Sequence, residues 1–375
     1  MTKVIEKFCE MPERELIDCR MTSFRDILLY NDIKVDSFSI CIISSIINFI
    51  FGQIKLRDSS NVTFWLAGGC VLKIEDIFFS NTGIKSNLFY FGDEDETWST
   101  IIRHIDSNTP LLVVLDSRYI VKNQPIKDFN IEYINIHNPS IAVVVGYDLK
   151  TKSVYLDLKE SNSNKICIAK FSEFMDSIQS NSFPLSPGKK YYILDIGQEY
   201  KSKFESNKPL IIKNSLLNSC DFMLGSKSPD SFQDTRIIES NTGIKGLYRL
   251  CEVLEEFLEN VECEEIDEKV LNKVFVYKFI SLRESLLPGS NTCYRDEYAQ
   301  GLINVADVLQ NKKLKKVGKL YFKIGMKWRA LVRLLYNSQF SINNKSKYIN
   351  NVISSVRSIA SDEENIFCEI KDAIS

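Results

Sequence analysis

The residue best suited to covalent chemistry is a cysteine at the predicted start of a helix. Cys19 follows the charged stretch PERELID and precedes a short helical pattern at 23–30. A thiol at a helix N-terminus faces the positive end of the helix dipole and exposed backbone N–H groups, which favour the thiolate and can hold an oxyanion. The chain has ten cysteines, so the alternative is that Cys19 is one more small buried side chain. Its place before a helix makes it the candidate nucleophile.

The chain contains only two histidines that could serve this thiol as a base. His137 lies in the loop IEYINIHNPS, directly before the apolar run IAVVV, whereas His104 lies in the helical stretch TIIRHIDS, where a solvated or capping role is expected. Asp157 ends the segment VYLD, and a hairpin of this segment with IAVVV would bring its carboxylate near His137. A thiol, an imidazole and an orienting carboxylate together carry out nucleophilic acyl transfer. A surface histidine and an ordinary strand-end aspartate remain the alternatives.

Composition argues against several other kinds of site. The ten cysteines form no C-x-x-C pair, which excludes a zinc knuckle or a thioredoxin-type motif, and two histidines leave almost no room for a multi-histidine metal site. No G-x-x-x-x-G-K-[ST] loop is present, so ATP is not expected. The sequence therefore predicts chemistry without a metal or a resident cofactor.

The net charge and the hydropathy of the sequence indicate which binding partners and which cellular compartment to expect. The chain has 47 basic and 49 acidic residues and a net charge of −2, which lacks the positive footprint of a dedicated nucleic-acid-binding protein. No apolar run reaches the roughly 18 residues of a membrane-spanning helix, and the first residues have no signal-peptide apolar core. We expect a cytoplasmic protein with reduced thiols that binds neither nucleic acid nor membranes.

The first 200 residues mix helical and strand patterns, which predicts an α+β domain. The segments with a helical pattern are 23–30, 35–51 and 98–105. The segments typical of strands are 111–116, 141–145, 154–157, 166–169 and 191–196.

Long amphipathic helical patterns dominate the second half of the chain. They cover 246–260, 294–310, 319–336 and 347–359. A stretch rich in Lys, Ser and Asn separates the halves, so we predict one domain at 1–200, a linker at 200–214 and an all-helical domain at 215–375. Within the helical domain, Trp328 and Tyr321 are expected to be core residues rather than a ligand box. A homodimer through this domain is compatible with the sequence.

Several segments in both halves of the chain resemble the two domains of one known family. In the first half they are CRMTSFRDILLYN at 19–31, TPLLVVLDSRY at 109–119 and PSIAVVVGYDLKTKSVYLD at 139–157. In the second half they are SNTGIKGLYRL at 240–250, YRDEYAQGL at 294–302 and KWRALVRLL at 327–335. These segments resemble the butirosin-biosynthesis-H-type acyltransferases, and the resemblance implies a papain-like (C39-like) cysteine-protease fold with a second, all-helical domain.

The resemblance also implies an activity, the ATP-independent transfer of an acyl group to an amine acceptor in natural-product biosynthesis. The acyl group would come from an acyl or peptidyl carrier protein, as a thioester on its phosphopantetheine arm. Cys19 matches the family's nucleophile, Asp157 its orienting acid and 146–148 its hairpin turn. Six residues before the turn glycine, where the family usually has histidine, this chain has Ser140. His137 lies three residues earlier, about 10 Å along an extended chain, so either the loop folds back or the base is lost.

Further residues are candidates for substrate contacts. Asp116 and Tyr119 follow the LLVVL run and, with Ser140, could line the same cleft. Arg295 and Arg329 could meet the phosphate of a phosphopantetheine arm, although their spacing does not require it.

Two other functions would use the same residues. One is a cysteine hydrolase or peptidase, in which water replaces the amine. The other is a non-catalytic binding protein on the same fold, which the serine at position 140 motivates.

Because no glutamine precedes Gln53, a papain-type oxyanion glutamine is missing, and the N–H groups at the helix start would have to stabilise the oxyanion instead. The acidic run at 93–96 is expected to be a solvated loop or to attract an amine substrate.

Overall fold

Antiparallel strands and long helices are both present along the chain, so the computed structural model has a mixed α+β fold. The structure describes residues 1–10, 18–55, 63–70, 74–121, 139–158, 166–181, 186–227, 237–262, 268–287, 292–340 and 342–375. Among the helices described there, none has the length and apolar character needed to cross a membrane.

The chain divides into two units, and each unit is built from two separate stretches of sequence. The first unit comprises Met1–Ile40 and Thr82–Asn207. The second unit comprises Cys41–Asn81 and Lys208–Ser375. Division of the sequence at a single point near residue 200 therefore does not separate these two units.

The predicted linker at 200–214 is part of a helix, α7 (Gln198–Met223), which crosses the boundary between the units. The polar residues of this stretch suggested a linker, but apolar side chains recur at helical spacing among them, and those at 204, 212 and 216 are buried. Two shorter helices also cross the boundary, α3 (Ser37–Ile43) and α4 (Ile74–Thr82).

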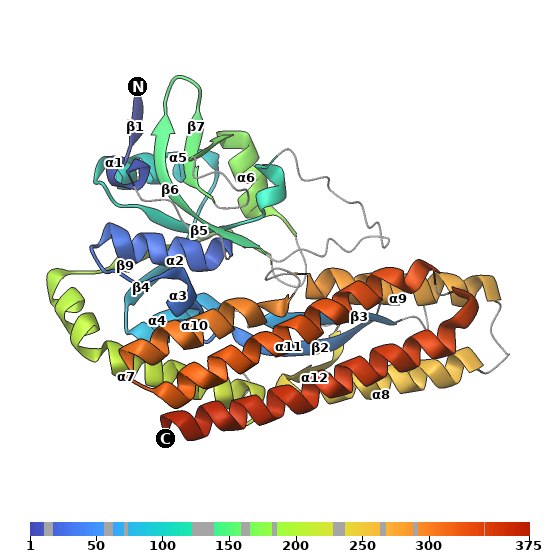
Figure 1. The fold of residues 1–375 in the computed structure, drawn as a ribbon. Coiled ribbons are helices and arrows are strands. Elements are labelled where there is room, and N and C mark those ends of the chain that lie inside the picture. The colour runs from blue at the N-terminus through green and yellow to red at the C-terminus, as the bar shows by residue number, and fades with distance from the viewer. Residues whose placement is uncertain are drawn as a thin grey trace. The chain divides into compact units, whose positions relative to one another are not determined.

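Within the described residues of the first unit, seven strands form one antiparallel sheet (Figure 1). The strand order is β4-β9-β5-β6-β7-β8, and β1 pairs with β6. The strands are β1 (Thr2–Val4), β4 (Lys85–Tyr90), β5 (Leu111–Leu115), β6 (Ser140–Asp148), β7 (Ser153–Asp157), β8 (Cys167–Lys170) and β9 (Lys190–Asp195). The helical segments described in this unit are α1 (Glu6–Cys9), α2 (Cys19–Tyr30), α5 (Glu94–Asp106), α6 (Phe171–Gln179) and the 3₁₀ turn η1 (Ser117–Tyr119).

The centre of this sheet is formed by the most apolar runs of the first unit. All of β5 and nearly all of β6 are buried, as expected for strands covered on both faces. The predicted hairpin is confirmed, since β6 pairs with β7. Its turn lies at 149–152, so residues 146–148, which the family resemblance implies as the hairpin turn, are part of β6. Gly146 instead lies inside β6 beside β1, where a Cβ atom would stand 2.6 Å from the carbonyl oxygen of Lys3.

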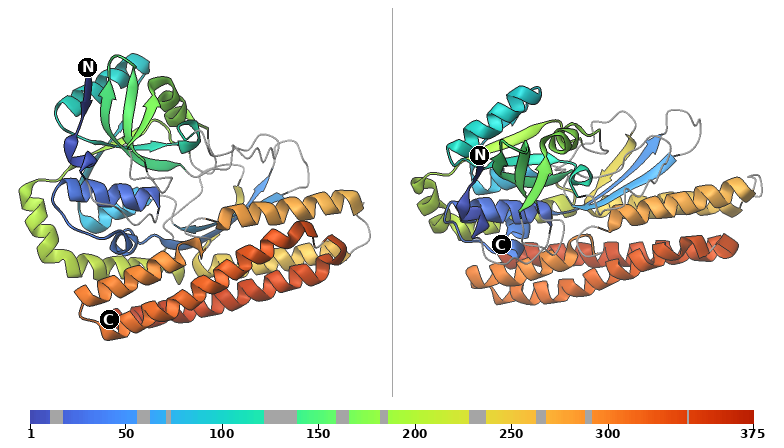
Figure 2. Two further views of the ribbon diagram at one scale, coloured as in Figure 1. Left: turned by 45° about the horizontal axis from the view of Figure 1, so that its top comes forward. Right: turned by 90° about the horizontal axis from the view of Figure 1, so that it is seen from above.

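The second unit is not all-helical, contrary to the prediction. Within its described residues, three strands form an antiparallel sheet in the order β10-β2-β3, and α8 packs on β2 while α9 packs on β3. Helices α10, α11 and α12 run side by side (Figures 1 and 2). The elements are β2 (Ile47–Lys55), β3 (Thr63–Cys70), β10 (Ile237–Thr242), α8 (Gly243–Glu262), α9 (Glu268–Leu286), α10 (Arg295–Val308), α11 (Lys312–Tyr336), α12 (Lys345–Ile374) and the 3₁₀ turns η3 (Asn337–Phe340) and η4 (Ile342–Asn344).

The helix predicted at 35–51 is in fact a short helix followed by a strand. Helix α3 ends at Ile43, and Ser45 then adopts a left-handed backbone conformation with φ of 46°. The chain turns there and continues as β2. A fully buried apolar run has no polar face, so its periodicity cannot distinguish a buried strand from a buried helix.

The two SNTGIK strings, at 80–85 and 240–245, share a left-handed glycine but occupy different elements. Gly83 follows the end of α4 with φ of 69°. Gly243 joins β10 to α8 with φ of 63°, and a Cβ atom there would lie 2.4 Å from the carbonyl oxygen of Met223. Only glycine fits such a position without strain.

A buried ion pair joins strands and helices of the second unit. Arg295, the first residue of α10, donates from Nε to Oε1 of Glu363 at 2.6 Å and from Nη2 to Oε2 at 3.0 Å, and neither side chain is exposed. Its Nη1 donates at 3.2, 2.7 and 2.7 Å to the carbonyl oxygens of Asn48, Gly69 and Cys293. The guanidinium therefore links β2 and β3 to α10 and α12.

Aromatic side chains complete this network. Trp328 Nε1 donates to Glu363 Oε1 at 2.9 Å, the Tyr321 hydroxyl donates to the same oxygen at 3.4 Å, and the Arg295 guanidinium lies 4.8 Å from the centre of the Trp328 ring. Burial disfavours the charged guanidinium, but the carboxylate of Glu363 outweighs this effect and raises the pKa of Arg295. Trp328 and Tyr321 are core residues, as predicted. Because Arg295 is fully buried, it does not contact a phosphate at the surface.

We expect Glu363→Gln to lower the free energy of unfolding by about 3–5 kcal/mol, because it leaves the buried charge of Arg295 without its counter-ion. Urea denaturation followed by circular dichroism measures this loss. The matched control is Glu255→Gln, which breaks the exposed pair with Arg357 and should cost about 1 kcal/mol or less. Equal losses in the two variants would contradict the central role of the buried pair.

Candidate functional site

Cys19 is the first residue of α2, which begins four residues before the predicted helical segment at 23–30. The helix is capped by Asp18, whose Oδ1 accepts a hydrogen bond from the backbone N–H of Arg20 at 2.9 Å. The side chain of Cys19 is half-buried. The thiol thus lies at the positive end of a twelve-residue helix, in the setting that lowers thiol pKa values in other proteins.

The start of α2 is attached to the start of β6 by two side chains. Arg20 Nη2 donates to the carbonyl oxygen of Pro139 at 2.9 Å, and Ser23 Oγ donates to the carbonyl oxygen of Ile141 at 3.1 Å. In the pairing of β6 with β7, the last matched residue toward this end is Val143. The helix therefore contacts β6 where it extends beyond the end of β7.

Asp157 lies at that same end of β7, directly opposite Val143, and only 2% of its surface is exposed. The pairing places Asp157 beside β6, two residues from Ile141, whose carbonyl oxygen Ser23 contacts. Side chains alternate between the two faces of a strand, and residues opposite each other share a face. Ser140 is three residues from Val143, so it points to the face opposite Asp157. A histidine at position 140 would thus be directed away from this carboxylate.

Ser140 occupies a buried polar contact of its own. Its hydroxyl donates to the hydroxyl of Ser117 at 3.1 Å, and both side chains are buried. Ser117 begins η1, the turn that follows β5, and Tyr119 ends that turn with 43% of its surface exposed. Tyr119 is therefore accessible for a substrate contact, whereas Ser140 and Ser117 link β6 to η1.

The carboxylate of Asp116 is fully buried and holds the turn after β5. Its Oδ1 accepts from Nε of Arg118 at 2.9 Å, and its Oδ2 accepts from Nη2 of Arg118 at 2.6 Å and from the Ser180 hydroxyl at 2.8 Å. These bonds fix η1 to the end of α6. Asp116 therefore has a structural role: it holds Arg118 and Ser180 in place, and its buried carboxylate is not exposed for a substrate contact.

The two histidines have different positions relative to this corner. His137, the predicted base, lies outside the described residues, two positions before Pro139. His104 lies on α5, where its ring packs against Tyr191 of β9 with the ring centres 6.4 Å apart. Burial, and to a lesser extent the charge of Arg103, lowers the pKa of His104.

The remaining charged candidates have structural roles. Asp93 caps α5, accepting from the backbone N–H of Glu96 at 2.9 Å, so the acidic run is the first turn of a helix rather than a solvated loop. Arg329 forms an ion pair with Asp296. Among the residues that the structure describes, no three His, Cys, Asp or Glu side chains come together as metal ligands would.

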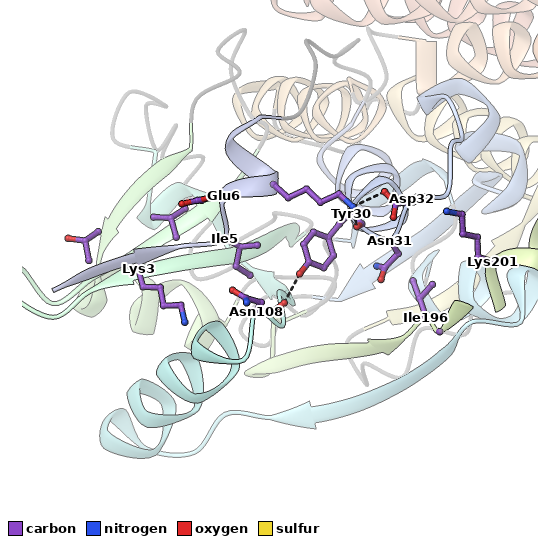
Figure 3. Close-up of a pocket in the computed structure, with 13 residues that line it drawn as sticks. Lys3, Ile5, Glu6, Tyr30, Asn31, Asp32, Asn108, Ile196 and Lys201 are labelled. Atoms are coloured by element: carbon purple, nitrogen blue, oxygen red, sulfur yellow. Dashed lines mark hydrogen bonds and ion pairs between the residues drawn. The ribbon is translucent and has the colours of Figure 1, made fainter. Parts of the chain in front are cut away.

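A pocket of about 720 Å³ lies at the other end of α2, between β1, α1 and the start of α7 (Figure 3). There the Tyr30 hydroxyl donates to the carbonyl oxygen of Asn108 at 2.6 Å, and Lys7 pairs with Asp32 at 2.8 Å. Tyr30 follows Cys19 by eleven residues, which is about 16 Å along a helix. The pocket is thus separate from the corner that holds Cys19.

Cys19, Ser140 and Asp157 lie at the starts of α2 and β6 and at the end of β7, and Asp116 and Tyr119 follow β5. Ser140 and Asp157 point to opposite faces of the sheet, so these two side chains do not line one cleft. Sequence reasoning missed Arg20 and Ser117, which make the contacts that join these elements. The position of Arg20, directly after the candidate nucleophile, was the available signal.

Comparison with known proteins adds no assignment, because no family model matches the sequence and no curated protein is significantly similar to it.

We expect iodoacetamide to label Cys19 several-fold faster than the exposed Cys368 at pH 7.5, because the helix start favours the thiolate. Burial raises the pKa of Cys220 and of Cys251 to about 12, so at pH 7.5 only about one in 3 × 10⁴ of these thiols is ionised and neither should react in the folded protein. Peptide mass spectrometry over time measures the rates. A Cys19 that reacts more slowly than Cys368 would contradict its activation.

Proposed function

We propose that the protein is an ATP-independent acyltransferase that moves an acyl group from a carrier-protein thioester to an amine through an acyl-Cys19 intermediate. The observation that carries the proposal is the placement of Cys19 at the start of α2, where Arg20 and Ser23 attach the helix to β6 beside Asp157. A cysteine at a helix N-terminus packed on an antiparallel sheet agrees with the papain-like fold that the sequence resemblance implies.

Both chemical steps exchange one acyl bond for another. The Cys19 thiolate attacks the thioester carbonyl, the C–S bond to the carrier breaks, and the carrier thiol leaves with the proton that His137 took from Cys19. The amine then attacks the acyl-enzyme, the amide C–N bond forms as the C–S bond to Cys19 breaks, and the amine proton passes to His137. Because thioester exchange is nearly isoenergetic, no nucleotide is consumed.

Asp157 orients the base in this proposal. Asp157 is buried at the end of β7, which pairs with the strand that follows His137 in sequence. Its carboxylate would hold the imidazole tautomer that accepts the Cys19 proton. The dipole of α2 would stabilise the oxyanion formed during each attack.

A non-catalytic binding protein is the second candidate, and one observation favours it. Ser140, at the position of the family's histidine, is buried against Ser117 and faces away from Asp157. The alkylation rate of Cys19 separates the two functions, because a binding protein has no need of an activated thiol. A hydrolase would instead consume a thioester at the same rate with and without an amine.

We expect wild-type protein, incubated with an acyl N-acetylcysteamine thioester, to gain the mass of one acyl group, and Cys19→Ala to gain none and to form no amide. Intact-protein mass spectrometry and amide quantification measure the two outcomes. Cys368→Ala, which removes an exposed thiol, is the control and should behave as wild type. Full turnover by Cys19→Ala would remove the assigned nucleophile.

We expect Asp157→Asn and His137→Gln each to slow acyl transfer about 10³–10⁴-fold, as in other orienting pairs. Because the two residues would act as one unit, the double variant should be hardly slower than the single variants. Single-turnover acylation of Cys19 across pH 6–9 measures the rates. Multiplicative losses in the double variant would mean that Asp157 does not act through His137.

A further inference from the structure

One face of α11 carries a row of five lysines, which we call the lysine face: Lys312, Lys316, Lys319, Lys323 and Lys327. Their spacing of four, three, four and four residues places them on the same side of the helix, over about 22 Å. All five are exposed, while the opposite side of α11 is buried within the second unit.

This helix concentrates positive charge in an otherwise acidic chain. It contains nine basic and no acidic residues. Since the whole chain has a net charge of −2, the residues outside α11 carry −11. The lysine face therefore concentrates positive charge in a chain whose other residues are net negative, and it would attract an acidic partner before contact.

The positive charges of the lysine face destabilise α11. Lys312 lies in the first turn, where the helix dipole disfavours a cation, and lysines four residues apart repel each other. Among the described residues, the one carboxylate within ion-pair distance of the lysine face is Asp362, which contacts Lys327. Within the described part of the chain, this single ion pair is the only such contact that offsets the repulsion, whereas an acidic partner would offset much more of it.

We propose that the lysine face docks the acidic surface of a carrier protein; the identity of this partner rests on the proposed function. Met326, 65% exposed beside Lys323 and Lys327, supplies an apolar contact within the charged face. Lysines are hydrated point charges that speed association without demanding one geometry, which suits a carrier that must bind and leave in each cycle.

Other polyanions fit the lysine face less well. A membrane-surface helix inserts a broad apolar face into the bilayer, but the apolar face of α11 is buried in the second unit. Nucleic acid extends well beyond 22 Å and would meet the surplus of negative charge on the rest of the chain. A small protein with a local acidic patch avoids both penalties.

The test compares two triple charge reversals in the full-length protein. Lys316→Glu/Lys319→Glu/Lys323→Glu changes the lysine face, and Lys245→Glu/Lys269→Glu/Lys273→Glu changes three exposed lysines of α8 and α9. The probe is a fluorescently labelled acidic holo-acyl carrier protein, and anisotropy is measured at 50 and 150 mM salt. We expect the lysine-face variant to bind at least about tenfold more weakly than wild type and the control variant to bind within about twofold. Circular dichroism checks that both variants are folded.

Three results would overturn the docking proposal: no binding by wild type at 50 mM salt, equal weakening in both variants, or tighter binding of a 20-base-pair DNA or of phosphatidylserine vesicles than of the carrier. A separate assay tests the proposed function, so that its failure can be distinguished from failure of the docking proposal. Acylation of Cys19 by the small N-acetylcysteamine thioester needs no docking, so the lysine-face variant should retain it. Cys19→Ala, conversely, should retain carrier binding.

Discussion

The second unit depends on one buried charge and its counter-ion. The Arg295 guanidinium donates hydrogen bonds to main-chain carbonyl groups of both β2 and β3, and the carboxylate of Glu363 neutralises its charge. A buried arginine is tolerated only where its donors are satisfied, so the strands and helices around it are specified together. This requirement explains why residues 41–81, which lie early in the sequence, belong with helices from the end of the chain.

The candidate site is organised by different means, through helix packing and contacts to main-chain carbonyl groups. Helix α2 buries Phe24 and Leu28, so its first residue is positioned by the core of the first unit rather than by a loop. Arg20 and Ser23 then hold the strand that follows the predicted base. A thiol fixed in this way can be aligned with a carbonyl group at little entropic cost during the reaction.

Local patterns in the sequence predicted much of the fold and some of the site. Helices α8, α10, α11 and α12, the β6–β7 hairpin and a helix close to Cys19 are determined by neighbouring residues and were predicted. Helix α9 was not predicted, and α7 lies where the sequence predicted a linker. The strand β2 was not, because a run buried on both faces has no periodicity that distinguishes strand from helix. The division into units and the contacts of Arg20 and Ser117 depend on residues that are distant in sequence. Ser140 and Asp157 point to opposite faces of the sheet because of the register between β6 and β7, which the amino-acid composition does not reveal.

Because each unit combines two separate stretches of sequence, the order in which the ribosome makes the chain affects its folding. Ile50 of β2 pairs with Thr242 of β10, so the sheet of the second unit cannot be completed until almost two hundred further residues have left the ribosome. Until then the nascent chain exposes the apolar strands β2 and β3 without their third partner, a state that invites aggregation and chaperone binding.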